Sequence, residues 1–575
     1  MQTTKRIIAA VLSLAFMLFI ANPMVAWAAD VNAGNAVTLV GYITGATEPM
    51  VITLTADIPL AALLGIPSGK DITLKSGHTS GNPPYRLIGA NGADTIENRG
   101  TLVLDGITVT HNVGEDGVGV YNTGAALLTL KSGKISGNSD SSGAGVFNSG
   151  TFDMSGGEIS GNTATSLGGG VYNNTNASFT IQGGKISGNT AEDGGGVFNF
   201  GVFAINGGEI SDNTAVYDGG GVCNYAPSLT MSNGTISRNS AEYGGGIFAR
   251  SGNSLTLNGG TISGNTATEY GGGVYSDIVS LVMNNGTVSE NEAPHGGGLY
   301  IENNAATFAL EGGTISGNIS NGHGGGVFSN AISSTMKAGV ISGNEAHHGG
   351  GIYLTNASGT FTMQGGMISN NIANGGGSAT GGHGGGVFSR ASSFTMSSSE
   401  VSANRASHGG GLYIDNGLFA MNSGNISGNQ ADRGGGIFVY QLNTANAQIN
   451  GGAISNNRAA VNGGGIWVTD SRVQSALQTL SVANGVVFSG NRAANAYDRN
   501  PADNTIYSAQ IQKANNTWSA SLPQGYNNYD ISYVWGHSVT FPVPALNPAM
   551  LVLLTLMLGV VAAVWQTQSF GKRRM

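Results

Sequence analysis

Six of the nine histidines lie close to glycine triplets in the second half of the chain. Those that directly precede a triplet are His295, His323, His348, His383 and His408, and His347 is adjacent to one of them. If these positions are stacked on neighbouring strands, about 4.8 Å apart, their imidazoles could chelate Zn²⁺, Cu²⁺ or Ni²⁺. They could also become charged together below about pH 6 and repel one another. No other cofactor is predicted.

The same position holds different residues in other repeats, namely Asp193, Asp218, Tyr243, Tyr270 and Arg433. This variety favours a second interpretation, in which repeat duplication has copied an exposed turn residue. The sequence therefore indicates a candidate metal-binding or pH-sensing column with a purely structural alternative.

Acidic residues are too dispersed to indicate a catalytic centre. Hydrolysis of a glycosidic bond needs two carboxylates about 5–10 Å apart, and a calcium-dependent lyase needs clustered acids beside a basic residue. The most regular acids, Glu158 and Glu209, alternate with Lys134 and Lys185 at one repeat position. We expect these four to form a ladder of opposite charges that contributes about 0.2–1 kcal/mol per pair. No catalytic residue is predicted.

The composition excludes several classes of protein. Glycine accounts for 96 of the 575 residues, and only 10% of the residues are charged. The net charge of −9 gives no basic surface for nucleic acid. The single cysteine, Cys223, cannot form an internal disulfide or supply the ligands of a structural zinc site. Stability must therefore come from packing.

A short unit with an apolar residue, a serine and an asparagine recurs through the middle of the chain. The first ten intervals between its asparagines cover 259 residues, which gives a period of 25.9. The asparagines are Asn112, Asn138, Asn162, Asn189, Asn213, Asn239, Asn265, Asn291, Asn318, Asn344, Asn371, Asn404, Asn429, Asn457 and Asn491. Alternating segments such as 360–363 have the period of a strand.

A second column of the repeat is mostly aromatic. It contains Tyr121, Phe147, Tyr172, Phe198, Cys223, Phe248, Tyr275, Tyr300, Phe328, Tyr353, Phe388, Tyr413, Phe438 and Trp467. Such columns predict an all-β parallel solenoid of fifteen or more coils, in which equivalent residues stack and bury one another over about 70 Å. The glycine triplets are expected to turn the corners of the coils. A phosphate-binding loop is not supported, because no Lys-Ser/Thr pair follows them.

These repeats resemble the right-handed parallel β-helix of bacterial surface proteins in the pectin-lyase-like superfamily. The segment 487–491, of sequence Val-Phe-Ser-Gly-Asn, is similar to the repeats of polymorphic outer-membrane proteins and autotransporter adhesins. The resemblance covers about 400 residues and implies the fold more than the function. Because this superfamily includes polysaccharide lyases and hydrolases, an extracellular polysaccharide-degrading enzyme stays an alternative.

The two ends of the sequence have the features of targeting segments. Basic residues, an apolar stretch over 7–21 and the small-residue site that ends at Ala28 indicate a secretory signal peptide over 1–28. Near the other end, an apolar stretch over 549–565 precedes three basic residues and predicts a transmembrane helix. The motif before it, Val543, Pro544, Ala545 and Leu546, resembles the IPTL-CTERM sorting signals of Gram-negative bacteria and implies processing by an exosortase-like peptidase.

Five segments are expected. They are the signal peptide (1–28), an N-terminal cap with the first coils (29–100), the β-helix repeats (101–497), a C-terminal cap (498–540) and the sorting tail (541–575). The expected function is that of an exported, non-enzymatic, adhesin-like surface protein. Its expected partners are signal peptidase, the sorting peptidase, a membrane before processing and a glycan or protein ligand. A structural component of the envelope or matrix is the other alternative.

Overall fold

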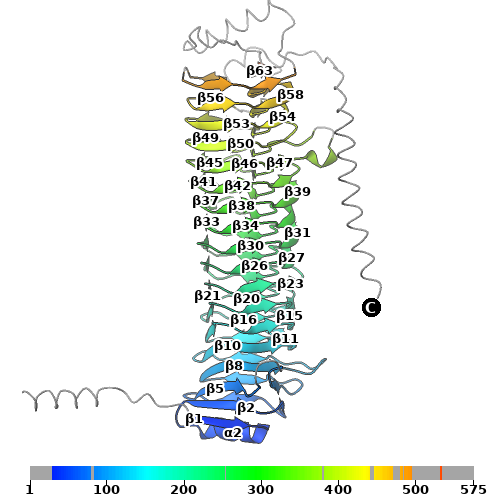
Figure 1. The fold of residues 1–575 in the computed structure, drawn as a ribbon, viewed down its shortest axis with the longest axis vertical. Helices are drawn as coiled ribbons and strands as arrows, with labels where there is room; N and C mark the ends of the chain where they lie inside the picture. The colour runs from blue at the N-terminus through cyan, green and yellow to red at the C-terminus, as the bar shows by residue number, and fades with distance from the viewer. Residues whose placement is uncertain are drawn as a thin grey trace, which may run out of the picture. The chain divides into compact units, whose positions relative to one another are not determined.

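A parallel β-solenoid of about 16 turns accounts for nearly all of the described structure (Figure 1). The computed structural model describes residues 29–78, 83–252, 254–378, 381–440, 446–469, 480–483, 485–494 and 531–533. The predicted signal peptide and the predicted sorting tail both lie outside these residues. No helix in the described ranges is long and apolar enough to cross a membrane.

Each coil contributes strands to three sheets. In one coil these are β17 (Ser178–Ile181), β18 (Lys185–Ser187), β19 (Thr190–Ala191) and β20 (Val197–Asn199). The first two belong to sheet A and bend where two glycines separate them; the third belongs to sheet C and the fourth to sheet B. The strands pair in parallel with β21 (Val202–Ile205), β22 (Glu209–Ser211), β23 (Thr214–Ala215) and β24 (Val222–Asn224) of the next coil. Equivalent residues therefore stack in register.

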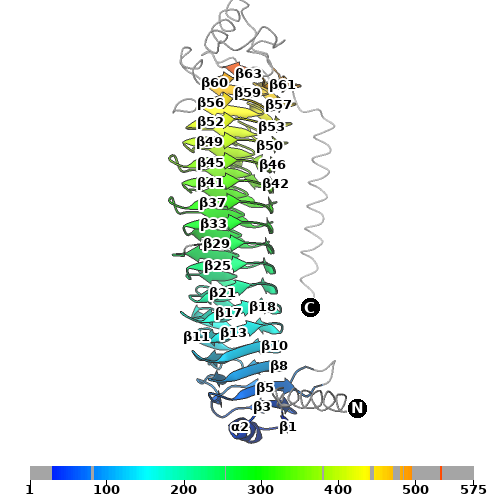
Figure 2. The same cartoon turned by 90° about the vertical axis from the view of Figure 1, so that its left-hand side faces the viewer.

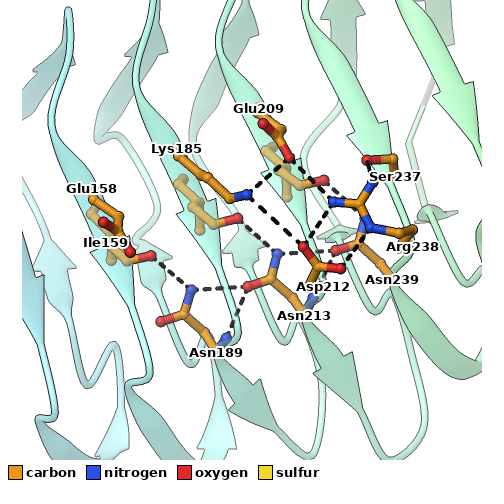
Figure 3. A network of polar contacts seen from close by, with 12 residues as sticks. Glu158, Ile159, Lys185, Asn189, Glu209, Asp212, Asn213, Ser237, Arg238 and Asn239 are labelled. Carbon is orange, nitrogen blue, oxygen red and sulfur yellow. Dashed lines mark hydrogen bonds and ion pairs between the residues drawn. The ribbon is translucent and has the colours of Figure 1, made fainter. Parts of the chain in front are cut away.

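The asparagine column lies inside the solenoid, where it joins successive coils. Asn265 Nδ2 donates to Asn291 Oδ1 at 2.9 Å and to the carbonyl of Ile236 at 3.0 Å. Its Oδ1 accepts from the backbone N–H and the Nδ2 of Asn239, both at 3.0 Å. Figure 3 shows the same arrangement around Asn189 and Asn213. Because all of these groups are buried, each coil satisfies polar atoms of its neighbours.

The first member of this column differs from the sequence prediction. Asn112 is exposed and donates from Nδ2 to Glu115 Oε2, so its assignment to the column is wrong. His111 takes the place instead, since its buried ring lies with Nδ1 2.9 Å from Asn138 Oδ1. The chain leaves the coil directly after His111, and the register between β8 (Thr101–Thr110) and β10 (Leu127–Ser136) shifts by a bulge.

A second asparagine ladder runs inside sheet B and was not expected. Each of its residues donates from Nδ2 to Oδ1 of the next over 2.6–2.8 Å, from Asn98 through Asn122, Asn148, Asn173 and Asn199 to Asn224. Beyond Asn224 the same position is filled mainly by small or apolar residues, beginning with Ala249. The recurring Val-aromatic-Asn triplet was the signal in the sequence.

The stack begins at β1 (Ala29–Ala33), which pairs with β2 (Met50–Leu54). Helix α2 (Ala36–Gly45) lies at this end (Figure 1), with Asn35 as its N-cap and Leu39 and Ile43 buried. At the other end, β63 (Ile531–Tyr533) pairs with β59 (Ile466–Thr469) in sheet B.

Candidate functional site

The five predicted histidines lie in one column beside sheet B. His295 pairs in register with His323, and β-bridges continue the column through His348 and His383 to His408. The centroids of successive rings are 5.2, 5.1, 4.8 and 5.1 Å apart. The sequence thus identified residues that the fold does bring together.

These imidazoles pack against the aromatic column, which lies on the outer face of sheet B. His323 stacks on Tyr353 with a centroid distance of 4.6 Å and an interplanar angle of 8°. His383 stacks on Tyr413 at 4.7 Å and 2°. The aromatic rings stack on one another as well, as Tyr353 does on Phe388 at 4.6 Å. One face of the His323 ring and one face of the His383 ring are therefore covered by a tyrosine ring.

Two of the imidazoles also bind the backbone of the next coil. The backbone N–H of His323 donates to Nδ1 of His295 at 3.2 Å, and that of His383 donates to Nδ1 of His348 at 3.1 Å. In a neutral ring the proton of these two residues must then lie on Nε2. Nδ1 of His323 is buried and has no hydrogen-bond partner within the described part of the chain.

Burial disfavours the charged form of these residues. Burial, together with the charges of neighbouring histidines, lowers the pKa of His323 and of His348 to about 4. The pKa of His295 is lowered mainly by burial. Joint protonation of the column is thus shifted to more acidic conditions than the pH of about 6 expected from the sequence.

Metal binding by this column stays a prediction. In the described part of the chain, no group of three or more His, Cys, Asp or Glu side chains could hold a metal ion. Because Nδ1 of His295 and of His348 accepts a backbone hydrogen bond while Nε2 carries the proton, neither neutral ring could offer a lone pair to a metal without losing that hydrogen bond.

Two carboxylates continue the column toward the N-terminus, and we did not single them out from the sequence. The backbone N–H of Asp218 donates to Asp193 Oδ1 at 3.0 Å, and the Tyr225 hydroxyl donates to Asp218 Oδ2 at 3.4 Å. Burial, together with the charge of Asp193, raises the pKa of Asp218 to about 6. Their place directly before glycine triplets was the available signal.

The expected charge ladder is present on sheet A (Figure 3). Lys134 Nζ lies 3.0 Å from Glu158, and Lys185 Nζ lies 3.1 Å from Glu209. Arg238 extends it with contacts to Asp212 at 2.8 Å and Glu209 at 3.5 Å. Because these side chains are about a third or more exposed, each ion pair contributes little to the stability of the fold, and the ladder is structural.

Sheet A also presents a neutral surface, which we call the hydroxyl face. It comprises the outward positions of β25 (Ser228–Met231), β26 (Thr235–Ser237), β29 (Ser254–Leu257), β30 (Thr261–Ser263), β33 (Ser280–Met283), β34 (Thr287–Ser289), β37 (Thr307–Leu310), β38 (Thr314–Ser316), β41 (Ser333–Met336), β42 (Val340–Ser342), β45 (Thr360–Met363) and β46 (Met367–Ser369). Figure 2 shows the first strand of each pair, from β25 to β45, stacked one above another.

The side chains of the hydroxyl face are short and uncharged. Three columns of it are at least partly exposed, and they carry Ser or Thr except at Val282, Ala309, Val340 and Met367. Their members are Ser228, Thr230, Thr235, Ser254, Thr256, Thr261, Ser280, Thr287, Thr307, Thr314, Ser333, Thr335, Thr360 and Thr362.

No protein-family model, curated protein or solved structure matches the chain. The predicted processing residues, Ala28 and the motif Val543, Pro544, Ala545 and Leu546, lie outside the described residues.

Proposed function

We propose that the chain is an exported surface protein of the adhesin type, which displays a rigid β-helix to a glycan. Its coils would have the right-handed sense found in about 98% of parallel crossovers. The signal peptide would direct export, and the C-terminal tail would hold the protein at the membrane until it is processed. The protein acts by binding and display, without catalysis.

The hydroxyl face is the observation that carries this proposal. Its three partly exposed columns carry no charged side chain over six coils, and the ion pair in the turns between two of them, Lys337 with Glu311 at 2.8 Å, has no net charge. Neutral hydroxyls can donate and accept hydrogen bonds with sugar hydroxyls, and they impose no charge on the partner. The expected ligand is therefore a neutral polysaccharide rather than an acidic one.

A binding screen of the full chain against neutral and acidic glycans tests this function, with turnover assayed in parallel. We expect saturable binding to a neutral glycan, and we expect the double variant Thr256→Asp/Thr261→Asp to weaken it about tenfold or more, because unpaired carboxylates would be desolvated in the contact. The matched control is Thr163→Asp, an exposed threonine on β15 (Thr163–Leu167) of sheet C.

Each outcome of the screen assigns a function. Binding that the Thr256→Asp/Thr261→Asp variant reduces and Thr163→Asp leaves unchanged supports the proposal. Cleavage of a polysaccharide would favour the enzymatic alternative. Absence of both binding and cleavage would favour a structural component of the envelope.

A further inference from the structure

Sheet C carries an outward column whose chemistry changes along the stack. In five successive coils its residues are Glu292, Ile319, Glu345, Ile372 and Arg405, and each pairs in register with the next. The strands are β35 (Glu292–His295), β39 (Ile319–His323), β43 (Glu345–Ala346) and β47 (Ile372–Ala373). Strands of this sheet, among them β31 (Thr266–Tyr270) and β39, follow one side of the solenoid in Figure 1.

The isoleucines of this column face solvent. The side chains of Ile319 and Ile372 are 44% and 39% exposed, whereas the residue that follows each glutamate or isoleucine on these strands is buried; these residues are Ala293, Ser320, Ala346 and Ala373. Glu292 and Arg405 are exposed, and neither has an ion-pair partner among the described residues. The column thus combines exposed apolar side chains with unpaired opposite charges, which is typical of an interaction surface.

The column is complementary to a second copy of itself that runs in the opposite direction. The coils are evenly spaced, so a second copy that runs antiparallel, with a two-fold axis through the Glu345 coil, places Glu292 opposite Arg405 and Ile319 opposite Ile372. The symmetry repeats each pairing, as a two-fold interface requires. We infer that sheet C is a homodimerisation surface on which two antiparallel solenoids associate through this column.

Strands beyond these five coils add a further pair of opposite charges to the proposed interface. Arg458 on β58 (Arg458–Asn462) lies two coils beyond Arg405 in the same column. In the antiparallel arrangement it faces the coil of β27 (Ser240–Tyr243), where Ser240 holds the column position in register with Thr266 and Glu242 lies two residues further along the strand. A third pairing of opposite charges is therefore available at each end of the interface.

Two contacts between like charges would destabilise the dimer. Glu345 faces its own copy on the axis, and Glu269 of β31 lies in the coil opposite Asp432 of β54 (Gln430–Arg433). The glycine-rich segment after Ile372 packs over the ring of His347 and so lies beside the column. The dimer is therefore weak, depends on ionic strength and is limited by Glu345.

Sedimentation velocity of the full chain in mild detergent, at low and high salt, tests this surface. We expect a concentration-dependent dimer that weakens as salt rises. Glu292→Arg should raise the dissociation constant about tenfold, because it replaces two attractive pairs by two repulsive ones. The double variant Glu292→Arg/Arg405→Glu should restore the dimer, and Glu345→Gln should strengthen it. Lys75→Glu, an exposed charge on sheet A, is the matched control.

A chain that stays monomeric at low salt overturns this inference. So does a dimer that is unaffected by Glu292→Arg, or one that the double charge reversal does not restore. Circular dichroism of each variant checks that the solenoid is intact. Glycan binding is measured on a different face, so loss of the dimer and loss of the proposed binding function are separate outcomes.

Discussion

At the residue scale, the histidines of the column pack as flat rings in the way that tyrosines do. Tyr270 stacks on Tyr300 at 4.7 Å, and His323 makes the equivalent contact with Tyr353 at 4.6 Å. A neutral imidazole can replace a phenol ring at this place, whereas an imidazolium loses solvation there. The column therefore depends on its histidines staying uncharged.

The double variant His323→Tyr/His348→Tyr should reduce the loss of stability in acid. The pKa of both histidines is about 4 in the folded chain, against about 6.5 when unfolded. The unfolded chain therefore binds more protons between these values, and stability falls as the pH decreases from about 6.5 to 4. Thermal unfolding at pH 7 and at pH 4.5 measures the difference.

Asp218 changes the pH dependence of stability in the opposite direction to the histidines, because its pKa is raised to about 6 in the folded chain. Protonation of Asp218 stabilises the folded chain as the pH falls. This effect is the same in the wild type and in the double tyrosine variant, so it cancels when the two are compared. His78→Asn, which changes a histidine outside the column, should leave the pH dependence as in the wild type. An unchanged acid sensitivity in the double tyrosine variant would contradict the prediction.

At the scale of the element, the glycine triplets turn each coil from sheet C to sheet B where backbone meets backbone. A Cβ on Gly350 would lie 2.4 Å from the carbonyl oxygen of Ile372 and 2.7 Å from that of Gly385. No movement of a flexible side chain can relieve these contacts. The triplet is thus a requirement of close stacking, and this accounts for much of the glycine content.

Gly350→Ala should lower the stability of its coil by about 1–3 kcal/mol, because the overlap displaces backbone. The matched control in the same coil is Gly343→Asn. Gly343 has φ +64°, a Cβ there would meet Gly317 N at an ordinary 3.9 Å, and Asn370 and Asn456 occupy the equivalent place with φ of 57° and 56°. Thermal unfolding and amide exchange compare the two variants. Equal stability of both would show that the close approach is not limiting.

The repeat period was enough to predict most features of a coil. The places where a coil departs from the repeat could not be predicted. The buried asparagine at Asn265 and the ladder of Lys185 and Glu209 follow from the 26-residue spacing. The exchange of Asn112 for His111 leaves no mark in the pattern: Val109 pairs with Ile135, so the 26-residue register places Asn112 level with Asn138, yet His111 makes that contact. Neither the shared environment of Asp193 and Asp218 nor the exposure of Ile319 could be deduced, because both require the register of neighbouring strands.

At the scale of the whole solenoid, the three sheets carry separate chemistry on one scaffold. Sheet A presents neutral hydroxyls, sheet B a stack of rings, and sheet C the column from Glu292 to Arg405. Each coil contributes to all three, and the asparagine ladders hold the coils together from inside. Binding to sheet A and dimerisation on sheet C can therefore take place on the same molecule.

The exported protein should begin at Ala29. Strand β1 starts at this residue, whose N–H donates to the carbonyl of Pro49 at 3.2 Å, so the residue directly after the predicted cleavage site is already paired in the solenoid. Intact-mass analysis of the full chain expressed with its own signal should show loss of residues 1–28. Ala28→Tyr should block this cleavage because the site requires a small residue, whereas Trp27→Leu, between the two alanines, should leave it unchanged. A mature chain that starts elsewhere, or one that retains residues 1–28, would contradict the export of this protein by a cleaved signal peptide.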